Sequence, residues 1–221
     1  MKNILNTGPK NFNPIRIAYL VIVITITCVG LSAAQNQQEA ERRLKGGLAF
    51  SSLNNTAWES SSTPGFVFGL SLGFPLTDAF MVQPEILYIE KGSRETVQET
   101  GTEFNLTLDY VEVPVLAKYQ LLDSGTIRPN IYAGPYAAFL IENHSDIEQP
   151  NSSEFSPDQL VQQAKDSEFG AILGAGADLH FTFNTMSVDL RYSTGLSNVF
   201  DVSTSQTIRN GSLIFMVGFS F

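Results

Sequence analysis

The sequence predicts an all-β fold, an eight-stranded antiparallel up-and-down transmembrane β-barrel preceded by a cleavable signal peptide. Three observations predict it. Apolar residues alternate with small or polar ones, long and short connections alternate along the chain, and the last strand ends on Phe221. A hydrophobic content of 43% is compatible with this fold, because half of each barrel strand faces a polar interior.

Residues 1–34 have the order of a secretory signal peptide. Basic residues precede an uncharged apolar run, 17–31, and small residues follow it up to Ala34. The alternative is a membrane-anchoring helix, but the apolar run is shorter than the roughly 20 residues that a spanning helix needs. We therefore expect export with cleavage after Ala34, a short periplasmic segment at 35–43 and an outer-membrane barrel domain at 44–221.

Cleavage would also remove the only cysteine, Cys28, which lies in the apolar run. A mature chain without disulfides is unlike a small secreted scaffold held together by disulfides. The same cleavage removes three of the 13 basic residues and none of the 22 acidic ones, so the mature chain is strongly acidic. This balance argues against nucleic acid as a partner, because binding to phosphates needs positive charge.

Eight segments have the character of β-strands, with ends predicted to within several residues. Long polar connections alternate with short turns, so both ends of the barrel domain lie on the side of the short turns. Bacterial outer-membrane barrels have this arrangement, with long extracellular loops and short periplasmic turns. The expected strands are 44–53, 64–74, 79–91, 104–121, 128–142, 168–182, 185–197 and 209–221. The expected long connections are 54–63, 92–103, 143–167 and 198–208, and the short ones are 75–78, 122–127 and 183–184.

The segment 64–74 shows the predicted faces most simply. Phenylalanines and leucines share one face and small residues share the other, because alternate residues of a strand lie on opposite sides. We expect the apolar face to contact lipid and the small or charged face to line the lumen.

Aromatic residues of the next two segments lie where the membrane borders are expected. In 79–91, Phe80 follows a short turn and Tyr88 precedes a long connection. In the following segment, Tyr110 and Tyr119 are about nine residues apart, close to the length of a tilted transmembrane strand. They have opposite parity, so this strand must contain a bulge or one inward-facing ring.

The last three segments close the predicted barrel. In 168–182 apolar residues alternate with several glycines, which fit a lumen just wide enough for side chains. In 185–197 they alternate with small or charged residues, and 209–221 has one wholly apolar face. We expect the last segment to pair with 185–197 on one side and with 44–53 on the other, which places Phe221 at the periplasmic rim.

Several charged residues fall on the predicted inward faces. We expect them to form a network of ion pairs that fills the lumen, because charges removed from water must be paired. The alternative is a selectivity lining or a proton pathway, although eight strands do not leave room for a wide aqueous channel. These residues are Glu85, Glu112, Lys118, Asp178, Asp189 and Arg191.

No catalytic, cofactor or metal site is predicted. The two histidines, His144 and His180, are too few and too far apart in the sequence to indicate a metal cluster. His144 with Ser145 leaves a membrane-embedded lipid-modifying enzyme as one alternative, although no acid partner or oxyanion donor can be placed beside them. A soluble periplasmic lipocalin-like binding protein is another, and it would have an apolar lumen and a polar exterior.

Several short motifs follow one another in order between residues 44 and 221. They are 83–88 with 91–92, 109–119, 132–136, 174–176 and 189–192. Their order resembles the PorT-like family of small outer-membrane β-barrel proteins. The resemblance implies an eight-stranded barrel in a Gram-negative outer membrane, with no catalytic activity shared across the family. The aromatic end, Phe219 and Phe221, is similar to the signal that the outer-membrane assembly machinery recognises.

These patterns predict a non-enzymatic integral outer-membrane protein whose long extracellular loops bind a partner or support an envelope or secretion assembly. The expected partners are outer-membrane lipid, the assembly machinery and an unidentified loop-binding protein or ligand. The connection 143–167 is a candidate binding loop, because long loops on a rigid scaffold often carry function, and it equally fits a solvated cap.

Overall fold

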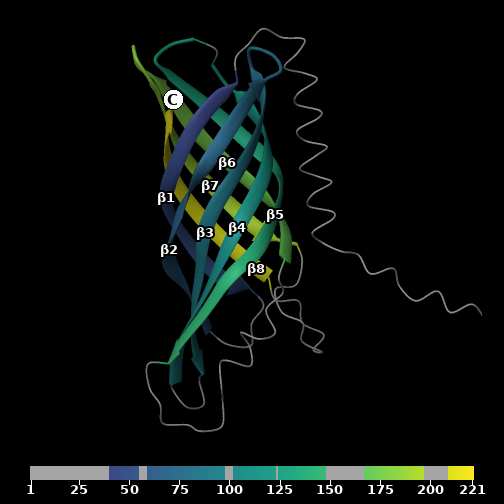
Figure 1. The fold of residues 1–221 in the computed structure, drawn as a ribbon, viewed down its shortest axis with the longest axis vertical. Coiled ribbons are helices and arrows are strands. Elements are labelled where there is room, and N and C mark those ends of the chain that lie inside the picture. Colours follow the sequence, from purple (N-terminus) through teal and green to yellow (C-terminus); the bar gives the residue numbers. More distant parts are fainter. Residues whose placement is uncertain (1–39, 55–58, 98–101, 123, 148–166, 197–208) are drawn as a thin grey trace, which may run out of the picture.

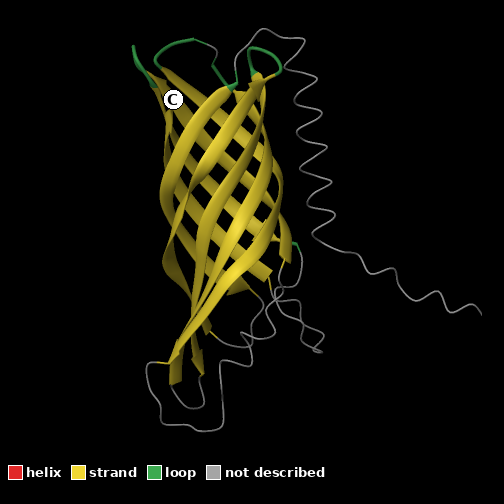
Figure 2. Cartoon of the chain, in the orientation of Figure 1, coloured by secondary structure: helices red, strands yellow, loops and turns green. Residues whose placement is uncertain are grey.

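The chain forms a closed barrel of eight antiparallel strands, each paired with its neighbours in the sequence (Figures 1 and 2). The computed structural model describes residues 40–54, 59–97, 102–122, 124–147, 167–196 and 209–221. The strands are β1 (Glu41–Asn54), β2 (Glu59–Pro75), β3 (Phe80–Val97), β4 (Thr102–Gln120), β5 (Ile127–Ile147), β6 (Ser167–His180), β7 (Thr185–Gly195) and β8 (Arg209–Ser220). β8 pairs with both β7 and β1, so the predicted fold class and the predicted closure are confirmed.

The two ends of the barrel differ. The short connections between strands and the C-terminus lie at one end, uppermost in Figure 1, which we call the turn end. The opposite end is the loop end, and there β5 reaches further than β8. No helix in the described part of the chain is long and apolar enough to cross a membrane.

The first strand begins earlier than predicted. β1 starts at Glu41 and not at residue 44, so residues 41–43 of the expected segment 35–43 are strand residues. Arg43 lies opposite Ser220 of β8. The sequence Glu-Arg-Arg has no apolar alternation that could mark a strand, and its pairing with a strand at the other end of the chain is not visible in the sequence.

Strands also extend into the predicted long connections. β2 begins at Glu59, β3 and β4 stay paired out to Val97 opposite Thr102, and β5 continues to Ile147. The predicted connections 54–63, 92–103 and 143–167 were therefore too long. These extensions are polar and lack the alternation that indicates a strand, whereas hydrogen bonds between neighbouring backbones do not depend on it.

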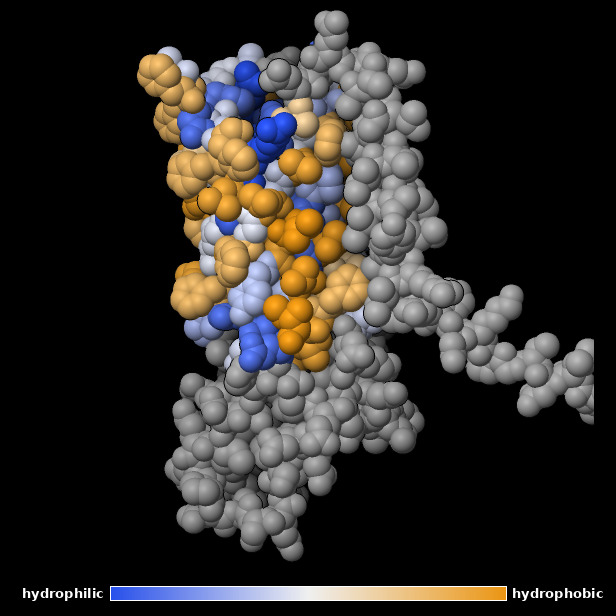
Figure 3. Space-filling model, viewed as in Figure 1, coloured by the Kyte–Doolittle hydropathy of each residue, from blue (hydrophilic) through white to orange (hydrophobic). Residues whose placement is uncertain are grey.

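The outer wall is apolar over most of its height. Leu173, Phe66 and Ile86 are 68%, 64% and 61% exposed, and orange apolar side chains cover the middle of the visible wall in Figure 3. On β8 the outward-facing Phe215 and Phe219 are exposed, whereas Ile214 and Met216, on the opposite face of the strand, are buried. The faces are therefore those of a barrel that contacts lipid, opposite to those of a lipocalin-like protein in water.

Tyr110 and Tyr119 separate onto the two faces. Tyr110 is 1% exposed and Tyr119 is 49% exposed. β4 therefore points one of the two rings into the lumen, which was the alternative to a bulge. A register shift between β4 and β5 also occurs at Asp109 and Tyr110, where Ile141 of β5 has no opposite residue.

Two inward tyrosines of β5 are matched by glycines of β6. Tyr132 lies opposite Gly174, and Tyr136 lies opposite Gly170. A Cβ atom on Gly174 would be 2.4 Å from a ring carbon of Tyr132, and one on Gly170 would be 2.3 Å from a ring carbon of Tyr136. These glycines provide the space that the rings need inside a narrow lumen.

Candidate functional site

Charged side chains fill the lumen in three groups that follow one another from the turn end to the loop end. The group nearest the turn end contains Asp178, which accepts from Arg43 Nη1 at 3.0 Å and from Lys118 Nζ at 2.7 Å. Arg43 also pairs with Glu41 at the rim. The two cations therefore meet two carboxylates, of which only Glu41 is partly exposed.

The middle group is centred on Glu85. Its carboxylate accepts from Lys45 Nζ at 2.8 Å and from Arg191 Nη1 at 2.7 Å. Lys45 Nζ is also 3.0 Å from Asp189 Oδ2, and the Arg191 guanidinium lies 5.3 Å from the centre of the Tyr132 ring. Two cations and two carboxylates balance, which is the condition for burying charge without a large cost.

The group nearest the loop end places two carboxylates beside one ammonium. Lys91 Nζ lies 3.2 Å from Glu112 Oε2 and 3.3 Å from Glu168 Oε1. The same ammonium lies 5.1 Å from the ring centre of Tyr110 and 5.0 Å from that of Tyr136, and Tyr136 donates a hydrogen bond to Glu168. Two carboxylates thus share one ammonium, which is further stabilised by two aromatic faces.

The structure brings the six predicted inward residues into these groups. Glu85, Asp189 and Arg191 meet in the middle, Lys118 and Asp178 near the turn end, and Glu112 near the loop end. All six are exposed by 2% or less. These side chains fill the lumen and do not line an open channel.

Five further members of the groups were missed by the sequence analysis, and one of them is Glu41 at the rim. Lys45 and Glu168 follow the same alternation as their neighbours, so parity could have identified both. Lys91 lies on the same face of β3 as Glu85, which was predicted to point inward, so parity could have identified it as well. The fifth, Arg43, had been assigned to the segment that precedes the barrel.

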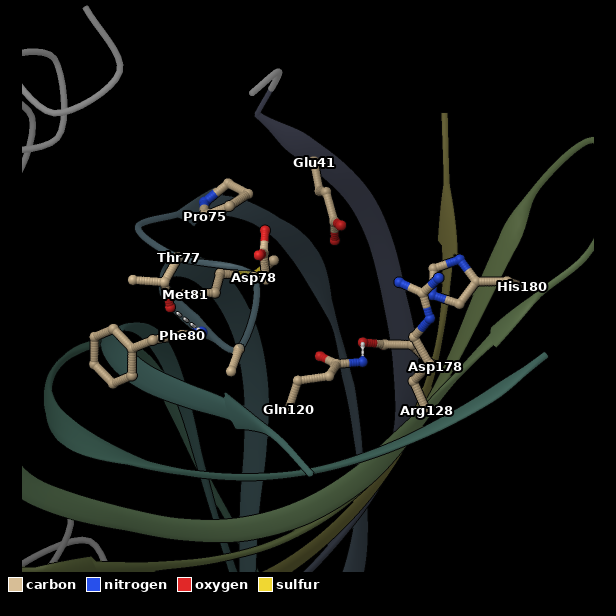
Figure 4. Close-up of a pocket in the computed structure, with 11 residues that line it drawn as sticks. Glu41, Pro75, Thr77, Asp78, Phe80, Met81, Gln120, Arg128, Asp178 and His180 are labelled. Atoms are coloured by element: carbon tan, nitrogen blue, oxygen red, sulfur yellow. Dashed lines mark hydrogen bonds between the residues drawn. The ribbon is translucent and has the colours of Figure 1, made fainter. Parts of the chain in front are cut away.

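A cavity of about 290 Å³ opens at the turn end, above the first charged group (Figure 4). The start of β1, the connection between β2 and β3, and the turn-end residues of β4, β5 and β6 line it. Its charged or titratable members are Glu41, Asp78, Arg128, Asp178 and His180. The floor is polar, because Gln120 Nε2 donates to Asp178 Oδ2 at 3.5 Å.

At the loop end, a row of carboxylates marks the border of the apolar wall. Glu90, Asp109 and Glu142 lie opposite one another on β3, β4 and β5. Tyr88 Oη donates to Asp109 Oδ2 at 2.9 Å, and Glu90 Oε2 accepts from the backbone N–H of Phe66 at 3.0 Å. Carboxylates on the outer face are costly within lipid, so the row indicates where the membrane ends.

The remaining candidates for chemistry are separated. His144 and Ser145 lie in β5 opposite Thr107 and Leu106, and their side chains are outside the described part of the structure. His180 lies at the other end of the barrel, in the turn-end cavity. Within the described residues, no group of three or more His, Cys, Asp or Glu side chains is placed to hold a metal ion.

One comparison with known protein families agrees with the geometry. A family model described as an outer membrane protein beta-barrel domain matches residues 33–201. Similar solved structures include Neisserial surface protein A, with 18% identity over 83% of this chain and 100% of that chain at a TM-score of 0.46. Another is OprG from Pseudomonas aeruginosa, with 12% identity, 83% and 97% coverage and a TM-score of 0.48. A third is the outer membrane enzyme PagL, with 14% identity, 81% and 98% coverage and a TM-score of 0.43. Among curated proteins, none matches significantly.

Proposed function

Because the chain belongs to the outer membrane protein beta-barrel domain family, we propose that it is a non-enzymatic outer-membrane protein whose loop end binds a partner or supports an envelope or secretion assembly. Within that family we assign it to the PorT-like barrels, on the order of its motifs. We further propose that residues 1–34 direct export and are removed, and that Phe219 and Phe221 are read by the assembly machinery. Phe221 is 76% exposed at the turn end, which leaves it accessible for that role.

The observation that carries this proposal is the extension of the sheet beyond the carboxylate row. β3 and β4 remain paired from Glu90 opposite Asp109 out to Val97 opposite Thr102. β4 and β5 remain paired out to Phe104 opposite Ile147. A paired, polar sheet that continues past the apolar wall is a rigid base from which loops can bind.

Among the described residues, one edge of this extension has no neighbouring strand. β5 pairs with β6 only as far as Phe139 opposite Ser167. Between Leu140 and Ile147, β5 has partners on β4 but none on β6 among the described residues. An edge strand of this length offers backbone groups to an added strand, which is one way in which sheets recognise proteins.

The alternatives receive less support. A soluble lipocalin-like binder is excluded by the apolar exterior and the charged lumen. A lipid-modifying enzyme would need a nucleophile, a base and an orienting group together at the loop end. No observation on the described residues favours that arrangement.

The orientation can be tested with single cysteines, because the mature chain is expected to have none of its own. Glu95→Cys lies in the loop-end extension and Asp78→Cys lies between β2 and β3 at the turn end. A maleimide that cannot cross membranes should label Glu95→Cys in intact cells and Asp78→Cys only after the outer membrane is opened. Labelling of Asp78→Cys alone in intact cells would refute the orientation.

Binding at the loop end can be tested by crosslinking. A photoreactive residue at Glu95 should give a defined adduct in intact cells, and the same residue at Asp78 should not give that adduct. A photoreactive residue at Ile147 of β5, outside the β3–β4 extension, should give the same adduct in the full chain. Replacing residues 93–106 by a tight turn should abolish the adduct from Ile147 without affecting the heat-dependent gel migration that is typical of a folded barrel. An adduct that persists in this shortened chain would exclude the extension as the binding surface.

A further inference from the structure

We propose that the turn-end cavity binds a small zwitterion, a molecule that carries an ammonium group together with a carboxylate or phosphate. The site lies at the opposite end from the loop-end surface and is independent of the function proposed for it. Three observations carry the inference: the size of the cavity, an arginine without a partner among the described residues, and the position of Glu41 and Asp78 away from Arg128 and His180 in the cavity (Figure 4).

The basic side of the cavity is formed by Arg128 at the start of β5 and His180 at the end of β6. Figure 4 places both on the same side of the cavity. Among the described residues, Arg128 has neither an ion pair nor a hydrogen-bond partner for its buried Nε atom. Because Nε is itself closed off from solvent, an anionic group in the cavity would meet the terminal guanidinium nitrogens of Arg128, and a charged donor of this kind favours an anion.

His180 is already oriented for such a ligand. Its Nδ1 atom is 3.1 Å from Thr185 Oγ1, which leaves the Nε2 atom as the ring nitrogen without a partner among the described residues. Asp178 accepts from Arg43 and Lys118, and among the described residues it forms no ion pair with Arg128. Among the described residues, this side of the cavity therefore has an arginine and a histidine ring nitrogen without partners.

The acidic side is formed by Glu41 of β1 and Asp78 of the connection between β2 and β3. Asp78 is exposed, and Glu41 shares its carboxylate with Arg43. These two carboxylates would repel a simple polyanion that approached Arg128, but they would attract an ammonium group on the same ligand. A zwitterion thus satisfies both sides, whereas a lone anion or a lone cation satisfies one.

The volume limits the ligand to a small molecule. A cavity of about 290 Å³ accommodates an amino acid, a dipeptide or the head group of phosphatidylethanolamine. Free zwitterions and lipid head groups carry the same pair of charges. The cavity recognises the combination of an ammonium and an acidic group. The binding experiment distinguishes a free zwitterion from a lipid head group.

The experiment measures binding to the full mature chain folded in detergent micelles. The probes are glycylglycine and phosphoethanolamine as zwitterions, inorganic phosphate as the anion alone, and ethylamine as the cation alone. Both zwitterions should bind at least about tenfold more tightly than inorganic phosphate or ethylamine alone. A tenfold difference corresponds to about one charge-assisted contact. Stronger binding of phosphoethanolamine than of glycylglycine would identify the head group as the source, and the reverse order would identify a free zwitterion.

Two substitutions test the two sides separately. Arg128→Gln should weaken zwitterion binding about tenfold or more, because it removes a charged donor. Asp78→Asn should weaken zwitterion binding but strengthen the binding of phosphate alone, because it removes a repulsive charge. Arg42→Gln is the matched control, since Arg42 is exposed on β1 at the same end and does not line the cavity.

Heat-dependent gel migration of each variant shows that the barrel is folded. The proposal is overturned if neither zwitterion binds saturably in the millimolar range, or if phosphate alone binds as well as phosphoethanolamine. Equal affinities of the natural chain and Arg128→Gln would also overturn it. None of these results bears on crosslinking at the loop end, so failure of this site and failure of the proposed function can be told apart.

Discussion

At the scale of single residues, the stability of the barrel depends on how charges buried away from water are paired. A buried ion is tolerated only beside its partner, and removing one partner costs more than the pair itself contributes. Arg191 makes two hydrogen bonds to Glu85, at 2.7 and 3.3 Å, from a position 106 residues away in the chain. Each such contact links strands that are distant in the sequence.

The group around Lys91 near the loop end gives a prediction with effects of different size at two positions. Lys91→Met leaves Glu112 and Glu168 without their shared cation and should lower the free energy of unfolding by about 3–5 kcal/mol. Glu112→Gln leaves one carboxylate for one ammonium and should change it by less than about 1 kcal/mol. Urea-induced unfolding in lipid vesicles, followed by circular dichroism, measures both changes. If Glu112→Gln were the more damaging substitution, the charge balance inferred for this group would be wrong.

At the level of strands, a glycine can accept a side chain only where the neighbouring backbone is not too close. Gly47 of β1 lies opposite Met216 of β8, at the seam that closes the barrel. A Cβ atom there would be 1.9 Å from the carbonyl oxygen of Phe215. On the neighbouring Gly46 the nearest atom would be 3.8 Å away.

This difference predicts unequal effects of the same substitution at adjacent positions. Gly47→Ala should lower the free energy of unfolding by about 1–3 kcal/mol, because the backbone of β8 must move to accept the methyl group. Gly46→Ala serves as the control and should change it by less than about 0.5 kcal/mol. Unfolding in urea and the fraction of heat-modifiable protein measure both. Similar losses at the two positions would mean that the seam is not as tightly packed as the structure shows.

The outward face of β8 gives a prediction that depends on depth in the membrane. Val217 lies in the middle of the apolar face of β8, whereas Ile141 of β5 lies next to Glu142 in the carboxylate row. Val217→Arg should cost about 2–4 kcal/mol, as expected for an arginine at the middle of the bilayer, and Ile141→Arg about 0–1 kcal/mol. Folding equilibria in vesicles measure the costs. Equal costs would contradict the membrane border drawn through Glu90, Asp109 and Glu142.

For the molecule as a whole, the closed lumen excludes a simple pore. Side chains of the middle group fill the cross-section, and Lys45, Glu85 and Arg191 are exposed by 2% or less. The two ends are thereby separated, so that a ligand in the turn-end cavity has no open path through the lumen to the loop end.

The closed lumen predicts the electrical behaviour of the protein. In planar lipid bilayers the natural chain should give no steady ion current. Replacing Lys45, Glu85 and Arg191 together by alanine removes both charges and volume from the middle group, and it should produce measurable conductance if the barrel still folds. The heat-dependent gel shift provides the folding control. A steady current through the natural chain would show that the ion pairs do not seal the lumen.

The sequence by itself determined the number of strands, their order and most of their faces. Alternation has a period of two residues and is therefore a local signal, which is why Phe215 could be assigned to lipid and Asp189 to the lumen without a structure. It failed where the local signal was absent, as at the polar extensions around Val97.

The tertiary structure alone decided which inward charges meet. Those contacts depend on the register of strands that are far apart in the chain and on closure of β8 onto β1, neither of which is encoded in any single segment. Lys45, Glu85 and Arg191 come from three strands, and only closure brings them within hydrogen-bonding distance. The turn-end cavity is likewise assembled from five separate parts of the barrel, so Arg128 and Asp78 acquire their shared role only in the folded molecule.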